Sequence, residues 1–297
     1  MPRPDDIYEK ITQRIMDDLR DGTPTGQRPW ATAGRAAVPL RHNGVPYQGV
    51  NILLLWCAAI DRGYVSPHWM TYRQAKELGG QVRRGERASH VFFANTVKKR
   101  PDGSEGGPAD EDDAEVLHVR RAYAVFNADQ IDDLPERYRV EIPEVNPGER
   151  LERCEAWFAN LGVDVRHGGE RAFYAPADDY IRMPPFATFR SPEAYYATLA
   201  HECCHLTGAK HRLDREMLKR DEESVAREEL IAELGSAFLC ADLGLAPEPR
   251  ADHAPYIASW LKALDGDPRG VATAATHAQR AVDFLHGLQD AGRAEAA

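Results

Sequence analysis

The chain has 297 residues, of which 43% are hydrophobic, and a formal net charge of −10. This length and composition predict two domains, each with its own core. No apolar run approaches the roughly 20 residues of a membrane helix, the charged first residues contain no signal-peptide core, and five cysteines, an odd number, argue against a disulfide framework. We therefore expect a cytoplasmic protein that does not bind membranes.

The first 140 residues form a predicted basic module. Residues 1–100 carry 16 Lys and Arg against 9 Asp and Glu, whereas residues 101–297 carry 21 against 38. Hydrophobic spacing predicts helices at residues 7–21, 49–62 and 72–78, and strands at 89–97 and 116–126. The acidic, Gly- and Pro-rich residues 101–114 between these strands predict a disordered insertion.

Basic residues of this module alternate with aromatic residues and glycine turns. Proteins bind single-stranded nucleic acid in this way, with cations near the phosphates and aromatic rings stacked on the bases. The competing interpretation is that the aromatic residues belong to the core and the charges to a solvated face. The candidate nucleic-acid-binding residues are Arg28, Trp30, Arg41, Tyr47, Trp69, Tyr72, Arg73, Lys76, Arg83, Arg84 and Arg87.

A Pro- and Glu-containing segment at residues 139–148 is the predicted linker between the domains. An amphipathic helix is expected at residues 149–161. Two short strands are expected within residues 171–184, and they form an edge on which an extended peptide could lie. The predicted boundaries are therefore 1–140 for the first domain and 149–297 for the second.

Residues 198–208 read Thr-Leu-Ala-His-Glu-Cys-Cys-His-Leu-Thr-Gly. Apolar residues at helical spacing predict a half-buried helix here. His201 and His205 are four residues apart and share one face, so both rings can bind one ion while Glu202 reaches the attacking water as general base. This spacing is typical of zinc peptidases, and it predicts Zn²⁺, or another divalent ion such as Mn²⁺, as the cofactor. The adjacent cysteines are expected to point away from the metal and to pack as small apolar residues.

A catalytic zinc ion needs a third protein ligand. Residues 227–239 predict a second helix, on which Glu229 and Glu233 lie one turn apart. We predict Glu229 as the ligand and Glu233 as the acceptor of a hydrogen bond from a liganding imidazole, with Glu228 off that face and solvated. His211 is the rival ligand, because Gly208 and His211 match the His-x-x-Gly-x-x-His pattern. The sequence leaves this alternative open.

Four motifs, in order, resemble the ArdC antirestriction proteins of conjugative plasmids. The resemblance spans nearly the whole chain and includes the segments at residues 45–56, 69–86, 125–131 and 201–205. It implies an α+β protein with a single-stranded-DNA-binding N-terminal domain and a zincin-like metallopeptidase C-terminal domain. It further implies protection of incoming plasmid DNA from the recipient's restriction enzymes during conjugation.

Three mechanisms of protection are compatible with these patterns. The metal site could hydrolyse a protein, for which a restriction-enzyme subunit is our suggested target. DNA coating alone could protect, with a non-catalytic, structural metal site as the alternative. Finally, the net charge of −17 over residues 101–297 could mimic DNA, although Lys and Arg interrupt the acidic residues, which makes this the weakest of the three.

Overall fold

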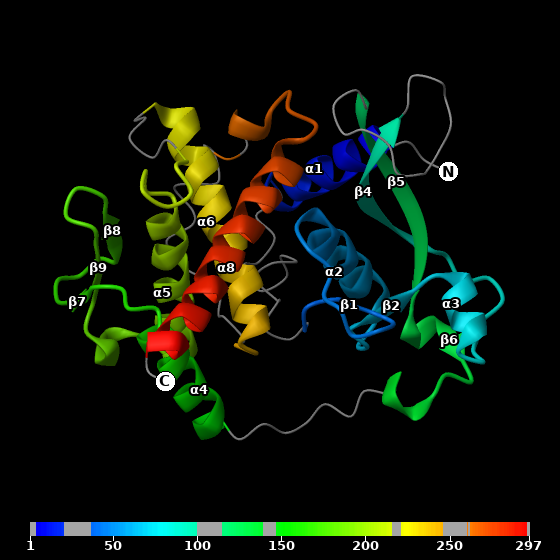
Figure 1. The fold of residues 1–297 in the computed structure, drawn as a ribbon, viewed down its shortest axis with the longest axis horizontal. Helices are drawn as coiled ribbons and strands as arrows, with labels where there is room; N and C mark the ends of the chain where they lie inside the picture. The colour runs from blue at the N-terminus through cyan, green and yellow to red at the C-terminus, as the bar shows by residue number, and fades with distance from the viewer. Residues whose placement is uncertain are drawn as a thin grey trace.

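The structure, a computed structural model, is an α+β protein with two sheet-and-helix regions (Figure 1). It describes residues 4–20, 37–99, 115–138, 147–215, 221–245, 260 and 262–295. The two-domain α+β class expected from the sequence is confirmed. The predicted insertion at 101–114 and the candidate residues Arg28 and Trp30 lie outside the described residues.

The N-terminal region carries the three predicted helices, which are α1 (Pro4–Arg20), α2 (Val50–Arg62) and α3 (Tyr72–Glu77). Its main sheet has the strand order β1-β2-β5-β4. The strands are β1 (Leu40–Arg41), β2 (His68–Met70), β4 (Ser89–Lys99) and β5 (Glu115–Asn127). The predicted pair β4 and β5 is antiparallel, with Ser89 opposite Val125 and Lys99 opposite Glu115.

A second, two-stranded sheet lies beside α3. It pairs β3 (Gln81–Val82) with β6 (Ile131–Asp132), and short 3₁₀ helices at Ala128–Gln130 and Glu136–Tyr138 flank β6. Thr71 starts α3 with a capping box, in which its hydroxyl accepts from the Gln74 backbone while the Gln74 side chain accepts from the Thr71 backbone. These elements form one end of the molecule (Figure 1).

The C-terminal region begins with α4 (Pro147–Ala159) and a three-stranded sheet of order β7-β9-β8. Its strands are β7 (Val165–His167), β8 (Phe173–Ala175) and β9 (Tyr180–Met183), and a 3₁₀ turn follows at Phe186–Thr188. Three long helices complete the region: α5 (Pro192–Thr207), α6 (Glu222–Asp242) and α8 (Gly270–Glu295). The strands β8 and β9 are the two short strands predicted within residues 171–184.

Helix α5 has clear start and stop signals. The Ser191 hydroxyl accepts a hydrogen bond from the backbone N–H of Ala194 (3.2 Å), and Pro192 occupies the first turn, where its missing N–H has no cost. The helix is buried over residues 195–207. A helix that is buried on every face lies inside the core rather than on it, and α5 therefore presents its polar side chains to other protein groups.

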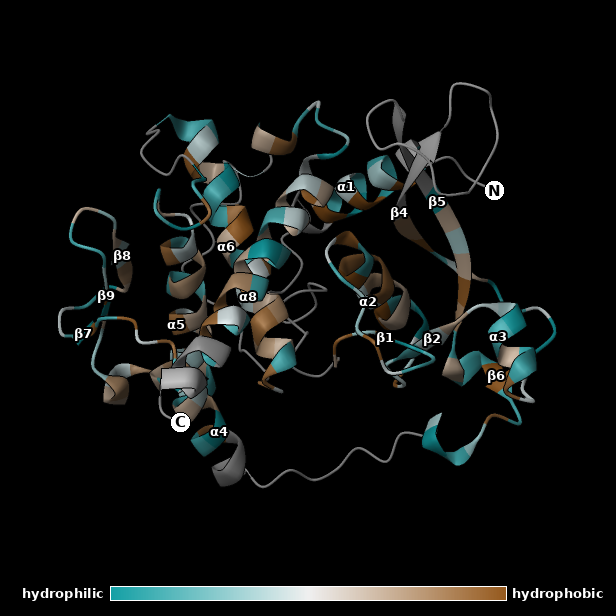
Figure 2. Ribbon diagram, in the orientation of Figure 1, coloured by the Kyte–Doolittle hydropathy of each residue, from teal (hydrophilic) through white to brown (hydrophobic). Residues whose placement is uncertain are grey.

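One hydrophobic core spans both regions. Trp56 of α2 packs on Phe238 of α6, with ring centroids 5.9 Å apart. Helix α8 contacts α1 and α2 as well as α5 and α6, and the Gln279 side chain accepts a hydrogen bond from the Gly49 backbone (3.0 Å). Hydrophobic residues gather on α2 and along β5 (Figure 2). Within the described ranges, no helix is long and apolar enough to cross a membrane.

Candidate metal centre and nucleic-acid interface

Two helices bring three ligand-type side chains together. His201 and His205 face α6 from consecutive turns of α5, and their Nε2 atoms are 3.1 Å apart. Glu229 of α6 faces both rings, with one carboxylate oxygen 3.5 Å from Nε2 of His201 and the other 3.6 Å from Nε2 of His205. Among the described residues, these three form the cluster that could hold a metal ion.

The spacing of this cluster fits a divalent ion. With ligands about 2.0–2.2 Å from a tetrahedral zinc ion, neighbouring ligand atoms are roughly 3.3–3.6 Å apart. The three separations above are close to that range, and a carboxylate with two imidazoles is a donor set common to Zn²⁺ and Mn²⁺ sites. The predicted divalent-metal cofactor therefore has residues that fit it.

Glu202 lies beside the first histidine on α5. Its side chain is buried, as are those of His201 and His205. The predicted general base is therefore held inside the protein next to the metal cluster.

Glu233 lies one turn beyond Glu229, as predicted. Its carboxylate faces the other nitrogen of the first histidine, with Oε2 3.6 Å from Nδ1 of His201. That separation is longer than a hydrogen bond, and Nδ1 is buried without a hydrogen-bond partner among the described residues. The role of Glu233 as an acceptor therefore stays a prediction.

The prediction for Glu228 was wrong. We expected a solvated side chain, but its carboxylate is only 13% exposed. Nδ1 of His205 donates to Glu228 (3.3 Å), and Arg215 donates to both of its oxygens (2.7 and 3.0 Å). Because α6 is buried on several faces, a residue one position away from the ligand still meets α5 and the loop that follows it.

The charges of the cluster are strongly coupled. Burial alone lowers the pKa of His205, but the carboxylates of Glu228 and Glu229 outweigh burial and raise it to about 10. Burial raises the pKa of Glu229, but the two neighbouring histidines hold it far below its usual range. The acids therefore favour cationic partners at this position, which suits a divalent ion.

His211 is not part of the cluster. Its imidazole is 61% exposed, and Nε2 lies 3.3 Å from the Asp179 carboxylate in the turn between β8 and β9. Asp179 also accepts two hydrogen bonds from Arg212 (2.7 and 2.9 Å) and one from the Tyr174 hydroxyl (2.8 Å). The loop after α5 is thereby attached to the β8–β9 turn.

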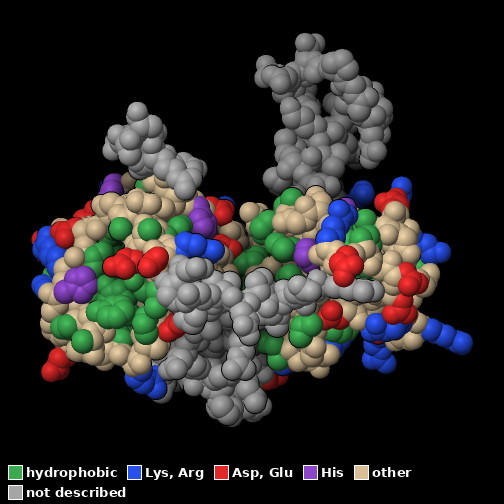
Figure 3. Space-filling view, turned by 90° about the horizontal axis from the view of Figure 1, so that it is seen from below, with side chains coloured by type: hydrophobic (Ala, Val, Ile, Leu, Met, Phe, Trp, Pro, Cys, Tyr) green, Lys and Arg blue, Asp and Glu red, His purple; other side chains and the backbone are tan. Residues whose placement is uncertain are grey.

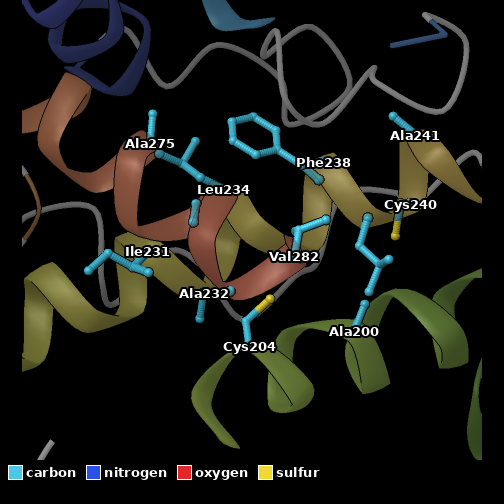
Figure 4. Packing of buried hydrophobic residues seen from close by; sticks show 14 of the residues in the cluster. Ala200, Cys204, Ile231, Ala232, Leu234, Phe238, Cys240, Ala241, Ala275 and Val282 are labelled. Carbon is cyan, nitrogen blue, oxygen red and sulfur yellow. The ribbon is translucent and has the colours of Figure 1, made fainter. Parts of the chain in front are cut away.

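The cysteines beside the ligands pack as expected. All five cysteines of the chain are buried free thiols. Cys204 points from α5 toward α6 and α8 (Figure 4). Burial raises the thiol pKa values of Cys203 and Cys204 well above the usual value, so these thiols remain protonated and unreactive.

Six of the candidate nucleic-acid-binding residues lie exposed on α3 and in the segment that follows β3. They are Tyr72, Arg73, Lys76, Arg83, Arg84 and Arg87. Figure 3 shows Lys and Arg side chains, mixed with Asp and Glu, at this end of the molecule. The Lys76 ammonium lies 5.9 Å from the centre of the Tyr72 ring, and this ring is 46% exposed. The surface thus offers cations and one open aromatic ring.

Two arginines of this surface differ in their partners. Arg83 pairs with Glu86 (3.0 Å) and Asp132 (3.5 Å) and donates to the Asp129 backbone. Arg84 has no hydrogen bond or ion pair with any residue that the structure describes. Arg84 is therefore the freer of the two to bind a phosphate.

Three other candidates lie elsewhere, and the prediction was wrong for two of them. Tyr47 and Trp69 belong to the hydrophobic core, with 4% and 1% of their surface exposed, so neither presents a ring to a base. Trp69 is buried because β2 is an inner strand of the four-stranded sheet. The Arg41 guanidinium lies over the rings of Tyr47 and Phe93, 5.6 and 4.7 Å from their centres, which is a packing contact.

Two family models match the chain. The N-terminal domain of the anti-restriction factor ArdC matches residues 5–126, and a zincin-like metallopeptidase domain matches residues 152–277. The second match contains the histidine and glutamate cluster. Fold and site thus define a protein in which an ArdC-type N-terminal domain is joined to a zincin-like metallopeptidase domain.

Solved structures identify the family. The metal-free crystal structure of the antirestriction protein ArdC from plasmid R388 is 45% identical, with a TM-score of 0.79, over 96% of this chain and 98% of that one. Its Mn(II)-bound structure, also 45% identical, has a TM-score of 0.76 over 95% of this chain and 97% of that one. The chain belongs to the ArdC family of antirestriction proteins, and its His201, His205 and Glu229 could hold a divalent metal ion.

Curated relatives include proteins of very different length. The uncharacterized protein y4eC of Sinorhizobium fredii (strain NBRC 101917 / NGR234) is 44% identical over 98% of this chain and 95% of its own length. Two Escherichia coli proteins, both DNA primase TraC, are 37% and 33% identical over 94% of this chain. The chain spans only 27% and 20% of these primases.

Proposed function

We propose that this protein protects incoming plasmid DNA from restriction during conjugation, by binding single-stranded DNA with its N-terminal half and hydrolysing a protein at its metal centre. The observation that carries the proposal is the convergence of His201, His205 and Glu229 in an ArdC-type chain. The DNA primase relatives support an association with DNA. A restriction-enzyme subunit is the protein substrate that we suggest.

The metal centre supplies the chemistry of peptide hydrolysis. The two histidines and Glu229 would hold the ion, and an ion of this kind lowers the pKa of bound water toward about 7. Glu202 would accept a proton from that water as general base and donate it to the leaving amine. Glu202 follows His201 directly on α5 and is buried, as are the two histidines.

The neighbouring sheet offers a place for an extended peptide. Helix α5 packs against β8 and β9, and β8 is an outer strand of the sheet β7-β9-β8. An outer strand has unpaired backbone groups that can pair with an added strand. A substrate on β8 would therefore lie alongside the helix that carries Glu202.

The exposed surface formed by α3 and the segment after β3 is the proposed contact with single-stranded DNA. Arg73, Lys76, Arg84 and Arg87 supply positive charge, and Tyr72 supplies an exposed ring. Base stacking and phosphate contacts together bind single strands without sequence preference. Contacts of this type make the affinity fall steeply with salt concentration.

The depth of the metal centre favours one alternative, in which DNA coating alone protects and the ion has a structural role. His201, Glu202 and His205 are 6%, 4% and 8% exposed. Little of their surface is therefore open to a substrate, whereas a structural ion needs no access for one. The alternative predicts that changing Glu202 leaves protection intact.

A conjugation assay into a restricting recipient separates the two functions. The wild-type protein is compared with Glu202→Gln and with the double variant His201→Ala/His205→Ala, each checked for folding, metal content and single-strand affinity. If hydrolysis protects, both variants lose protection while keeping DNA affinity. Full protection by Glu202→Gln would contradict hydrolysis and support DNA coating.

A further inference from the structure

Arg215 lies in the loop after α5, yet its side chain is only 4% exposed. The loop turns back under the helix: the Arg215 N–H donates to the Gly208 carbonyl (3.1 Å), and the preceding Asp214 has a φ of 48°. A non-glycine residue seldom adopts such a conformation unless its surroundings fix it. The chain therefore accepts local strain in placing this guanidinium inside the protein.

The guanidinium joins α5 to α6. It donates to the Thr207 hydroxyl (2.7 Å) and to the Cys204 carbonyl (2.7 Å), both near the end of α5. Its other two hydrogen bonds form a bidentate pair, or fork, with the two carboxylate oxygens of Glu228 in the first half of α6. Such a fork holds a carboxylate in a fixed plane, which a lysine cannot do.

The carboxylate that Arg215 holds is the one that contacts a metal-ligand histidine. Oε1 of Glu228 accepts from both Nη2 of Arg215 and Nδ1 of His205. A proton on Nδ1 leaves Nε2 of that ring free to bind an ion, and the same hydrogen bond fixes the rotation of the ring. Buried without Arg215, the Glu228 charge would lack its main partner.

We infer that Arg215 is a positioning residue of the metal centre: it fixes the Glu228 carboxylate on His205 and so keeps Nε2 of that imidazole directed at the ion. The inference rests on the metal centre of the proposed function and does not depend on peptide hydrolysis. A purely structural role, in which Arg215 only attaches the loop to the end of α5, is the competing explanation.

The chain offers a matched control in the same loop. Arg212 forms a bidentate ion pair with Asp179, but neither residue contacts a metal-ligand side chain in the part of the chain that is described. Arg215→Lys and Arg212→Lys each keep the charge and remove a fork. Both weaken the loop, but only the first releases the carboxylate beside His205.

The test measures Zn²⁺ and Mn²⁺ dissociation constants of the metal-free proteins, with melting temperatures in parallel. Loss of a residue that hydrogen-bonds to a metal ligand weakens metal binding by about 10- to 100-fold. We expect Arg215→Lys and Glu228→Gln to fall in that range and the double variant to lose no more than either, because both act through His205. Arg212→Lys should stay within about twofold of the wild-type protein, since it leaves every partner of the ligands in place.

The visible absorption of the Co²⁺-loaded proteins gives a second readout, because it reports the geometry of the ligands. We expect the bands to change in Arg215→Lys and Glu228→Gln and to stay unchanged in Arg212→Lys. Should Arg215→Lys fail to fold, the affinity and spectrum of Glu228→Gln decide the question. Unchanged affinity and spectra in the folded variants, with only a lower melting temperature, would show that Arg215 is structural. A wild-type protein that binds none of the three ions would instead contradict the metal centre itself.

Discussion

The sulfur of Cys204 occupies the space that a side chain on Gly235 would need. A Cβ placed on Gly235 would lie 2.6 Å from that sulfur and 3.5 Å from the Cys204 Cβ. Cys204 points from α5 toward α6 and α8 (Figure 4), and Gly235 lies on α6, two residues after Glu233. The close approach of these helices therefore depends on a glycine.

Gly235→Ala tests this contact. Alanine favours a helix over glycine by about 1 kcal/mol, whereas overpacking a core costs about 1–3 kcal/mol. Because the clashing sulfur is short and enclosed, we expect the clash to win and the free energy of unfolding to fall, as measured by urea denaturation.

The same substitution should have the opposite sign once the sulfur is removed. In a Cys204→Ala background the new methyl group has room, so Gly235→Ala should raise the free energy of unfolding by about 1 kcal/mol, the helix preference alone. Equal effects in the two backgrounds would show that the crossing does not need the glycine.

The ligand set can be tested by comparing Glu229→Ala with His211→Ala. Loss of a residue that only hydrogen-bonds to a ligand weakens metal binding by about 10- to 100-fold. Removal of Glu229, which is itself a predicted ligand, should therefore weaken metal binding by more. His211→Ala should leave the metal dissociation constant unchanged, because this exposed ring contacts Asp179 instead of the cluster. Titration with a chromophoric chelator measures both, and the reverse order would identify His211 as the third ligand.

Arg83 and Arg84 should contribute unequally to single-strand affinity. Each phosphate contact adds about 0.7 to the slope of log affinity against log salt concentration for single strands. We expect Arg84→Ala to reduce that slope by this amount, and Arg83→Ala to change it less, since neighbouring acids already neutralise Arg83. Fluorescence anisotropy with a labelled oligonucleotide at several salt concentrations gives the slopes. Equal reductions would mean that the ion pairs of Arg83 open on binding.

Asp179 should stabilise the fold at neutral pH and lose that effect in acid. Hydrogen bonds from Arg212 lower its pKa from 3.8 to about 2. Between these values the unfolded chain binds more protons than the folded one, so stability rises with pH through this window. We expect the stability difference between wild type and Asp179→Asn to be constant above about pH 5 and to shrink as the pH falls toward 2, as measured by urea denaturation at each pH.

Asp178 provides the control for this measurement. It is exposed and lies in the same turn. Asp178→Asn should show little pH-dependent difference from wild type. A difference as large as that of Asp179→Asn would attribute the effect to the general charge of the turn.

Local patterns in the sequence predicted the elements of the fold well, because they depend on residues close in the chain. The helix through His201, the α2 helix and the β4–β5 pair all follow from spacing and turn residues. The core shared by both regions was not predicted from the sequence. Trp56 and Phe238 are far apart in the chain, and the difference in charge between its two parts had suggested two separate domains. Burial of Tyr47 and Trp69 likewise depends on strand order, which no local pattern contains.

The metal centre was predictable to the extent that one helix face defines it. The four-residue spacing places His201 and His205 together, and a turn of the next helix supplies Glu229. Glu228 was misjudged because helical periodicity describes one helix and not the neighbours around it. Its partner Arg215 gave no signal, since a single arginine in a charged stretch resembles any surface residue, and only the course of the loop brings it inside.

The contacts of α8 limit which part of this protein can be fused to another protein with its core intact. This helix covers apolar surface on α1 and α2 as well as on α5 and α6. A recombination event that moved only one half into a new gene would leave that surface open to water and to aggregation. The segment that can be exchanged between genes with its interior intact is therefore the whole two-region unit. The match to the TraC primases has that extent, since it covers 94% of this chain within much longer proteins.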